Sequence, residues 1–154
     1  ARPENYRPIA ITNTIYRVIM KLLRKVISRA TDGTLAKNQY GGRATYTATE
    51  QAMNLQHAAE RQHGEGGRPI VVLLDVAKAF QSIPHEAIHR VLHNLACPQP
   101  IAAMIRKIYN NTETSCNVAG EDIKYAPKRG VKEGCPCSPL FFLLVYNMLV
   151  KHLT

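Results

Sequence analysis

A run of five apolar residues, from Ile70 to Leu74, stops abruptly at Asp75 and constrains the fold more than any other feature. Three of the five are β-branched, and a loop rich in glycine precedes the run. A continuous run of this kind is typical of a strand buried on both faces, so we expect a sheet at the centre of the fold. An acidic residue at the end of such a strand lies where active sites tend to form. The same carboxylate is also consistent with a plain turn or a helix cap.

The spacing of apolar residues predicts helices and one hairpin around this strand. From Ile15 to Ile27 apolar residues recur every three or four positions, which predicts an amphipathic helix whose opposite face is basic. A second helix is expected over 45–62, with four residues turned inward: Ala48, Ala52, Leu55 and Ala59. Further helices are expected from about 84, over 100–109 and from about 139, and strands over 115–118 and 123–125 are expected to form a hairpin.

The charge balance points to a polyanionic partner. The chain carries 20 Lys and Arg against 11 Asp and Glu, a formal net charge of +9. Nucleic acid is the first candidate partner and an anionic membrane the second, although basic domains without either role are common. No apolar run approaches the roughly 20 residues that a membrane span needs, and no signal peptide begins at Ala1. The absence of an initiator Met suggests a piece of a longer protein.

The residues that follow the run favour one family. Leu73-Leu74-Asp75-Val76-Ala77-Lys78-Ala79-Phe80 puts a large aromatic ring five positions beyond the carboxylate, with small residues in that interval. The segment resembles motif A of reverse transcriptases, and the wider chain resembles the enzymes of non-LTR (LINE-like) retrotransposons, with group II intron proteins next. Three more segments resemble family motifs in the family's order: Asn5–Ile11 the first fingers motif, Asn38–Arg43 the Gln-x-Gly-Phe-Arg block, and Arg129–Leu140 motif B.

The resemblance implies an RNA-templated DNA polymerase that uses Mg²⁺ or Mn²⁺ to activate the primer 3′-hydroxyl and to neutralise the triphosphate. Asp75 would be the catalytic carboxylate and would bind the metal together with the backbone carbonyl of Val76. Phe80 would act as a steric gate that excludes the ribose 2′-hydroxyl. The nucleotide-binding residues carried over are Arg7, Ala79, Phe80, Glu133 and Gly134, and the template-binding residues are Gln39 and Arg43. The implied partners are an RNA template, a DNA primer and deoxynucleoside triphosphates, in the nucleus.

The fold implied is α+β, an incomplete right-hand polymerase fold with helical fingers and part of a palm that contains an antiparallel sheet. We expect fingers over 1–68, palm with motif A over 69–96, a helix and hairpin returning to the fingers with the motif B loop over 97–137, and a palm helix over 138–154. Motif C, an aromatic-x-Asp-Asp hairpin, has no counterpart, because no Asp-Asp dipeptide occurs. We therefore expect the rest of the palm and the thumb to belong to a longer polyprotein, and this chain alone to be inactive.

Three positions depart from the family pattern. Gly42 stands where Phe is usual, Gln81 where these elements often have a second Asp, and Glu133 where motif B usually has Gln. The Asp that is usual at position 81 is not the metal ligand, so the chemistry survives its loss. A carboxylate at position 133, beside a triphosphate, is electrostatically unfavourable. Gln81 and Glu133 lean toward the alternative hypothesis of a non-catalytic, polymerase-like scaffold that binds nucleic acid. Asp75 and Phe80 lean against it, because a scaffold needs neither a metal carboxylate nor a gate.

Two metal-site patterns have simpler interpretations. His85, His89 and His93 lie four positions apart, a spacing that can bind zinc, but a polar helix face explains them without a ligand set. The spacing of Cys135 and Cys137 is tighter than in structural zinc sites, so we interpret the four cysteines as small buried thiols. The basic face of the first helix is either solvated charge or a track for the template backbone.

Overall fold

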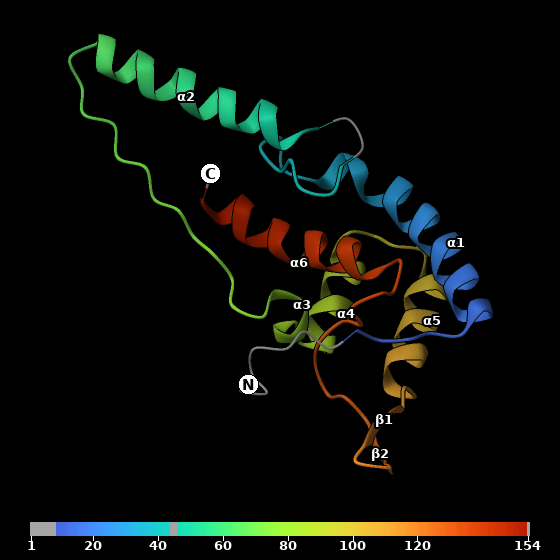
Figure 1. The fold of residues 1–154 in the computed structure, drawn as a ribbon. Coiled ribbons are helices and arrows are strands. Elements are labelled where there is room, and N and C mark those ends of the chain that lie inside the picture. The colour runs from blue at the N-terminus through green and yellow to red at the C-terminus, as the bar shows by residue number, and fades with distance from the viewer. Residues whose placement is uncertain (1–8, 44–45, 154) are drawn as a thin grey trace.

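The computed structural model describes residues 9–43 and 46–153 of the chain. Its helices are α1 (Thr14–Thr31), the 3-10 turn η2 (Asp32–Thr34), α2 (Ala48–Gly64), α3 (Ala79–Ser82), α4 (His85–Asn94), α5 (Gln99–Asn110) and α6 (Ser138–Leu153). Two strands, β1 (Thr114–Val118) and β2 (Glu121–Tyr125), pair as an antiparallel hairpin in which Thr114 faces Tyr125. The α+β class is thus confirmed, and helices dominate the part described (Figure 1).

One hydrophobic core joins α1, α4, α5 and α6. Met20 and Ile27 from α1, Leu92 from α4 and Phe141 from α6 are fully buried in it. The buried residues of α1, Met20, Leu23 and Ile27, lie three and four positions apart, so this helix presents one apolar stripe to the core. The buried Asn147 of α6 adds a polar contact, because its Oδ1 accepts the Ala36 backbone N–H at 2.8 Å. The core therefore also anchors the segment that follows η2.

Helix α1 begins where predicted but buries only part of its apolar surface. The Asn13 side chain caps it by accepting the Ile15 backbone N–H at 2.8 Å. Leu23 and Ile27 are buried, whereas four apolar residues on the neighbouring stripe stay exposed: Ile15, Val18, Leu22 and Val26. The apolar arc read from the sequence is wider than the face that one neighbouring helix can cover. The basic side chains of α1 are exposed as expected.

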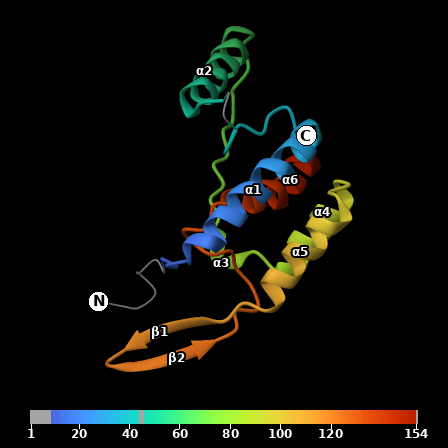
Figure 2. The ribbon, with the colours of Figure 1, turned by 90° about the vertical axis from the view of Figure 1, so that its right-hand side faces the viewer.

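Helix α2 forms as predicted, but the prediction of its inward face was wrong. Thr47 caps the helix by accepting the Glu50 backbone N–H at 3.1 Å. No residue of α2 is buried, and Ala48, Ala52 and Leu55 are exposed. The helix stands away from the other helices (Figures 1 and 2). Cap and helix-forming residues specify α2 locally, but its small alanine face contributes little to any packing.

The predicted central strand is absent from the described residues, which corrects the first expectation. Residues 70–74 run in an extended return path from α2 to α3 (Figure 1) without strand pairing. Their side chains are exposed, from 50% at Val71 to 88% at Ile70. A strand needs backbone partners, and the only sheet in the part described is the β1–β2 hairpin. Apolar and β-branched composition identified a segment suited to a sheet but could not supply the neighbouring strands.

The hairpin forms almost where the sequence predicted, with Ala119 and Gly120 at its tip. Both tip residues have positive φ, 55° and 91°, which suits a tight two-residue turn. The hairpin projects from the helices (Figure 2), and all strand residues except Thr114 are exposed. Among the described helices, none is long and apolar enough to cross a membrane.

Candidate active site

Asp75 ends the exposed extended segment, and the chain turns sharply just after it. Asp75 itself is exposed and Val76 is half-buried. Lys78 has φ 51° and ψ 44°, a left-handed conformation that is costly for a residue with a side chain. Its carbonyl accepts the backbone N–H groups of Gln81 and Ser82, each at 2.9 Å. This turn redirects the chain into α3 and places Ala79 and Phe80 within one turn of the carboxylate.

Phe80 packs against α6 but keeps part of its ring accessible. Its centroid lies 5.4 Å from that of Phe142, which in turn lies 4.3 Å from the ring of Tyr146. Phe80 is half-buried at the edge of the core. The Phe80 ring is thus held from one side, by its contact with Phe142. A ring fixed in this way can act as a rigid wall for a ligand at its open edge.

The loop that resembles motif B lies directly along the segment that resembles motif A. The Val131 N–H donates to the Phe80 carbonyl and the Gly130 N–H to the Ile83 carbonyl, both at 2.7 Å. The imidazole Nε2 of His85 lies 2.9 Å from the Gly130 carbonyl oxygen. The two segments are 50 residues apart in the chain, yet they share a backbone ladder. Sequence reasoning identified both segments, but it missed His85 as a contact of the loop.

Two glycines permit this close approach. Gly130 has φ 90°, and a Cβ there would lie 3.1 Å from the Gln81 carbonyl oxygen. Gly134 has φ 104°, and a Cβ there would lie only 2.9 Å from the Ala10 carbonyl oxygen. Both positions therefore need glycine for its backbone conformation and for its missing side chain. In both cases the close neighbour is a backbone carbonyl of the protein itself.

The segment that follows Arg7 meets the same loop. The Ala10 N–H donates to the Glu133 carbonyl at 2.9 Å, and the Glu133 carboxylate accepts the Gln81 amide at 3.3 Å. Arg7 itself, predicted to bind the triphosphate, lies outside the described residues. The structure thus brings together Phe80, Glu133 and Gly134 and ties the 9–11 region to them. None of the contacts that join these residues could have been identified from the sequence alone.

Gln39 and Arg43 belong to a different part of the molecule. Arg43 lies 3.6 Å from Asp32, its guanidinium lies 4.4 Å from the centre of the Tyr46 ring, and its Nη1 donates to the Gln39 carbonyl at 3.4 Å. None of their contacts in the described part of the chain involves 75–82 or 129–134. Arg43 instead lines a cavity of about 520 Å³ beside α1 and α6, together with Arg24 and Arg29. Three guanidinium groups around one cavity suit a phosphate-bearing ligand.

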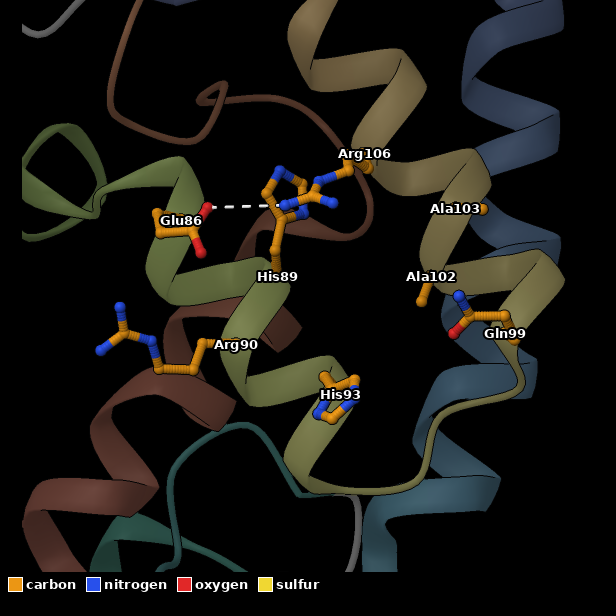
Figure 3. A pocket seen from close by; sticks show the side chains of 8 residues that line it. All are labelled: Glu86, His89, Arg90, His93, Gln99, Ala102, Ala103 and Arg106. Carbon is orange, nitrogen blue, oxygen red and sulfur yellow. Dashed lines mark ion pairs between the residues drawn. The ribbon is translucent and has the colours of Figure 1, made fainter.

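A second cavity, of about 340 Å³, lies between α4 and α5 and contains none of the predicted site residues. Figure 3 shows His89 and Arg106 on its wall, with the Glu86 carboxylate 3.8 Å from the Arg106 guanidinium. His85 turns away to the motif B loop and to the Tyr109 ring, 4.8 Å from centre to centre. The described residues contain no group of three or more His, Cys, Asp and Glu side chains that could hold a metal. The polar helix face expected for the three histidines is found only at the exposed His93, because His85 and His89 are half-buried.

Burial favours the neutral form of His89 and makes the stability of the fold sensitive to acid. Its Nε2 is buried without a hydrogen-bond partner in the part described. Desolvation, and then the Arg106 charge, lower its pKa below the usual 6.5. The unfolded chain therefore binds a proton at this histidine near pH 6.5, whereas the folded chain binds it only at lower pH. The free energy of unfolding therefore falls as the pH falls through this range.

We expect the free energy of unfolding to drop between pH 7.5 and pH 5.5, and His89→Gln to reduce that drop. Urea denaturation at both pH values measures it. The matched control is His57→Gln, because His57 is exposed on α2. If both variants keep the wild-type pH dependence, His89 does not cause it.

The cysteines behave as buried thiols with one exception. Burial, assisted by the nearby Cys135, raises the pKa of Cys137 to about 12, so it stays protonated at neutral pH. Its Sγ donates to the Met20 carbonyl at 2.9 Å, which links the motif B loop to α1. Cys97 and Cys135 are also buried, but Cys116 is exposed on β1 and corrects the prediction at that position. A thiol that is buried and stays protonated packs in the core, and it is a poor metal ligand because metals bind the thiolate.

Asp75 is the one acidic side chain in the 75–82 turn, and no ion pair joins it to another of the residues that the structure describes. An exposed carboxylate without a protein partner is available to a cation. Mg²⁺ commonly takes only one or two protein carboxylates and completes its shell with phosphate oxygens and water. One carboxylate and the adjacent Val76 carbonyl fit the protein's share of such a site.

Comparison with known proteins identifies the family of the chain. The family model described as reverse transcriptase (RNA-dependent DNA polymerase) matches residues 2–154. The Pol polyprotein of the type-2 retrotransposable element R2DM of Drosophila melanogaster is 28% identical over 153 residues, which cover 99% of this chain. R2 Pol polyproteins of Popillia japonica and Nasonia vitripennis are 28% and 29% identical over 98% of the chain. The chain spans only 14%, 21% and 15% of the length of these three relatives.

Proposed function

The chain belongs to the reverse transcriptase (RNA-dependent DNA polymerase) family, and on this premise we propose that it supplies part of the active site of an RNA-directed DNA polymerase within a longer protein. The observation that carries the proposal is the backbone ladder between Phe80–Ile83 and Gly130–Val131, because it joins the two segments that would hold the nucleotide. The expected substrates are an RNA template, a DNA primer and deoxynucleoside triphosphates. The fold would be the fingers and part of the palm of a right-hand polymerase.

We assign metal binding and nucleotide binding to the residues at one end of this backbone ladder. Asp75 and the Val76 carbonyl would hold Mg²⁺ or Mn²⁺, which would activate the primer hydroxyl and neutralise triphosphate charge when bound. Arg7 would contact the triphosphate, and the Phe80 ring, held by Phe142, would exclude a ribose 2′-hydroxyl. Ala79, Glu133 and Gly134 would complete the nucleotide pocket. The support for this assignment is that the 75–82 turn is hydrogen-bonded to the motif B loop, through Phe80 and Val131 and through Gln81 and Glu133.

The template contacts would lie on the other side of α6. Arg43 shares its cavity with Arg24 and Arg29 of α1, and Gln39 lies just before it in the chain. This grouping favours the track hypothesis for the basic face of α1, since successive guanidinium groups can follow a phosphate backbone. In this proposal residues 1–68 serve as fingers, 69–96 and 138–154 as palm, and 97–137 as the connection between them. The longer polyprotein would act in the nucleus and supply the remaining palm and thumb.

Primer extension by the longer protein that carries this chain tests the proposal. We expect a DNA primer annealed to an RNA template to be extended with deoxynucleotides when Mg²⁺ or Mn²⁺ is present. Addition of EDTA should stop extension. Salt-dependent binding of the primer–template without extension in either metal would contradict the proposal and favour the non-catalytic scaffold.

A further inference from the structure

Two of the three departures from the family pattern touch each other. The Gln81 Nε2 donates to Glu133 Oε1 at 3.3 Å, and both residues are half-buried. The pair lies beside the backbone ladder, and the Glu133 carbonyl also accepts the Ala10 N–H at 2.9 Å. The contact therefore sits where three chain segments meet: the one that follows Arg7, the one that follows Asp75, and the motif B loop.

The chemistry of the pair depends on having one amide and one carboxylate. An ionised carboxylate only accepts hydrogen bonds, so Glu133 needs a donor, and the Gln81 amide provides one. The usual family residues, Asp at 81 and Gln at 133, would offer the same partners in reversed order. Two carboxylates at this distance would instead repel each other in a half-buried setting. The residue that suits position 81 thus depends on the residue at position 133.

We propose that Gln81 and Glu133 form a positioning pair in which the Gln81 amide fixes and partly compensates the Glu133 carboxylate, so that the motif B loop tolerates an acidic side chain beside an incoming nucleoside triphosphate. This inference rests on the proposed function of the site. Gln81 acts through Glu133 and is not itself a contact of the nucleotide. The two departures are then one compensated change and not two separate signs of a non-catalytic scaffold.

A double-mutant cycle in the longer protein tests the pair. Gln81→Glu keeps the length of the side chain and places a second carboxylate against Glu133, so we expect the KM for deoxynucleotides to rise roughly tenfold. Glu133→Gln removes the charge and should lower KM. The exchange Gln81→Glu with Glu133→Gln should recover most of the loss, with kcat changing by less than about twofold across the cycle. Gln81→Asp alone should be harmful, although Asp is common there in the family.

A matched pair on α2 provides the control. Gln56 donates to Glu60 at 2.7 Å with the same chemistry, but on an exposed helix face far along the chain from the site. Gln56→Glu, Glu60→Gln and their exchange should leave KM unchanged. Additive effects on KM at positions 81 and 133, or a harmless Gln81→Glu, would overturn the proposed pair.

If the wild-type protein extends no primer, the proposed function fails instead. The same cycle measured by urea unfolding then decides the pair, and additive unfolding energies reject it.

Discussion

Replacing Asp75 by Asn in the longer protein is expected to lower primer extension on the order of 10³-fold or more. A metal ion stabilises transition-state charge by several kcal/mol, and each 1.4 kcal/mol is worth about a factor of ten in rate. Asn keeps the shape of the side chain but loses the charge that holds a divalent cation. Within residues 9–43 and 46–153, Asp75 makes no ion pair whose loss would disturb the fold. The measurement is single-turnover extension at saturating nucleotide and metal.

Binding should survive the same substitution. The net charge of +9 comes from many exposed Lys and Arg side chains, so the affinity for primer–template and its dependence on salt should be close to the wild-type values. Asp122→Asn is the matched control, because Asp122 is an exposed carboxylate on β2 that accepts the Asn117 amide at 2.9 Å. It should leave extension unchanged. Full activity of the Asp75 variant would remove this carboxylate from the metal site, and a wild-type protein that binds without extending would be a scaffold.

The sequence predicted the local elements well because local rules specify them. Periodicity located α1, α4 and α5, the last helix was expected from about Pro139, and turn residues located the hairpin at Ala119 and Gly120. The same rules failed wherever burial depends on a distant neighbour. Residues 70–74 have strand composition but no pairing partner in the part described, and α2 has a helical pattern but no buried face. Composition indicates what a segment could bury and not whether another segment covers it.

The candidate site likewise contains residues that local sequence patterns predict and contacts that depend on distant segments. Motif spacing identified Asp75, Phe80 and the motif B glycines, because each residue type has a chemical or conformational role at its own position. The contacts Gln81–Glu133, His85–Gly130 and Ala10–Glu133 could not be predicted, since they join segments between 45 and 123 residues apart. Positions 81 and 133 were marked as departures from a pattern. Only the structure shows that the two side chains are in contact, with the Gln81 amide donating to the Glu133 carboxylate.

Gly134→Ala is expected to cause the largest loss of stability among the single substitutions considered. A residue with a side chain at φ 104° loses about 1–2 kcal/mol of stability because its backbone is left-handed. Its Cβ would also lie 2.9 Å from the Ala10 carbonyl oxygen, a backbone atom that cannot rotate away. Overpacking of that kind costs about 1–3 kcal/mol, so the sum is roughly 2–5 kcal/mol. This is a large share of the roughly 5–15 kcal/mol that holds a typical domain together.

Two other glycines separate the conformational cost from the close contact. Gly120 has φ 91° with open space around a Cβ, so Gly120→Ala should cost only the backbone part, about 1–2 kcal/mol. Gly33 has neither feature, and Gly33→Ala should change stability by no more than about 0.5 kcal/mol. Urea denaturation of the three variants measures each step. If Gly134→Ala costs no more than Gly120→Ala, then the 9–11 segment does not press on the motif B loop. The junction that would place Arg7 beside the nucleotide loses its physical basis in that case.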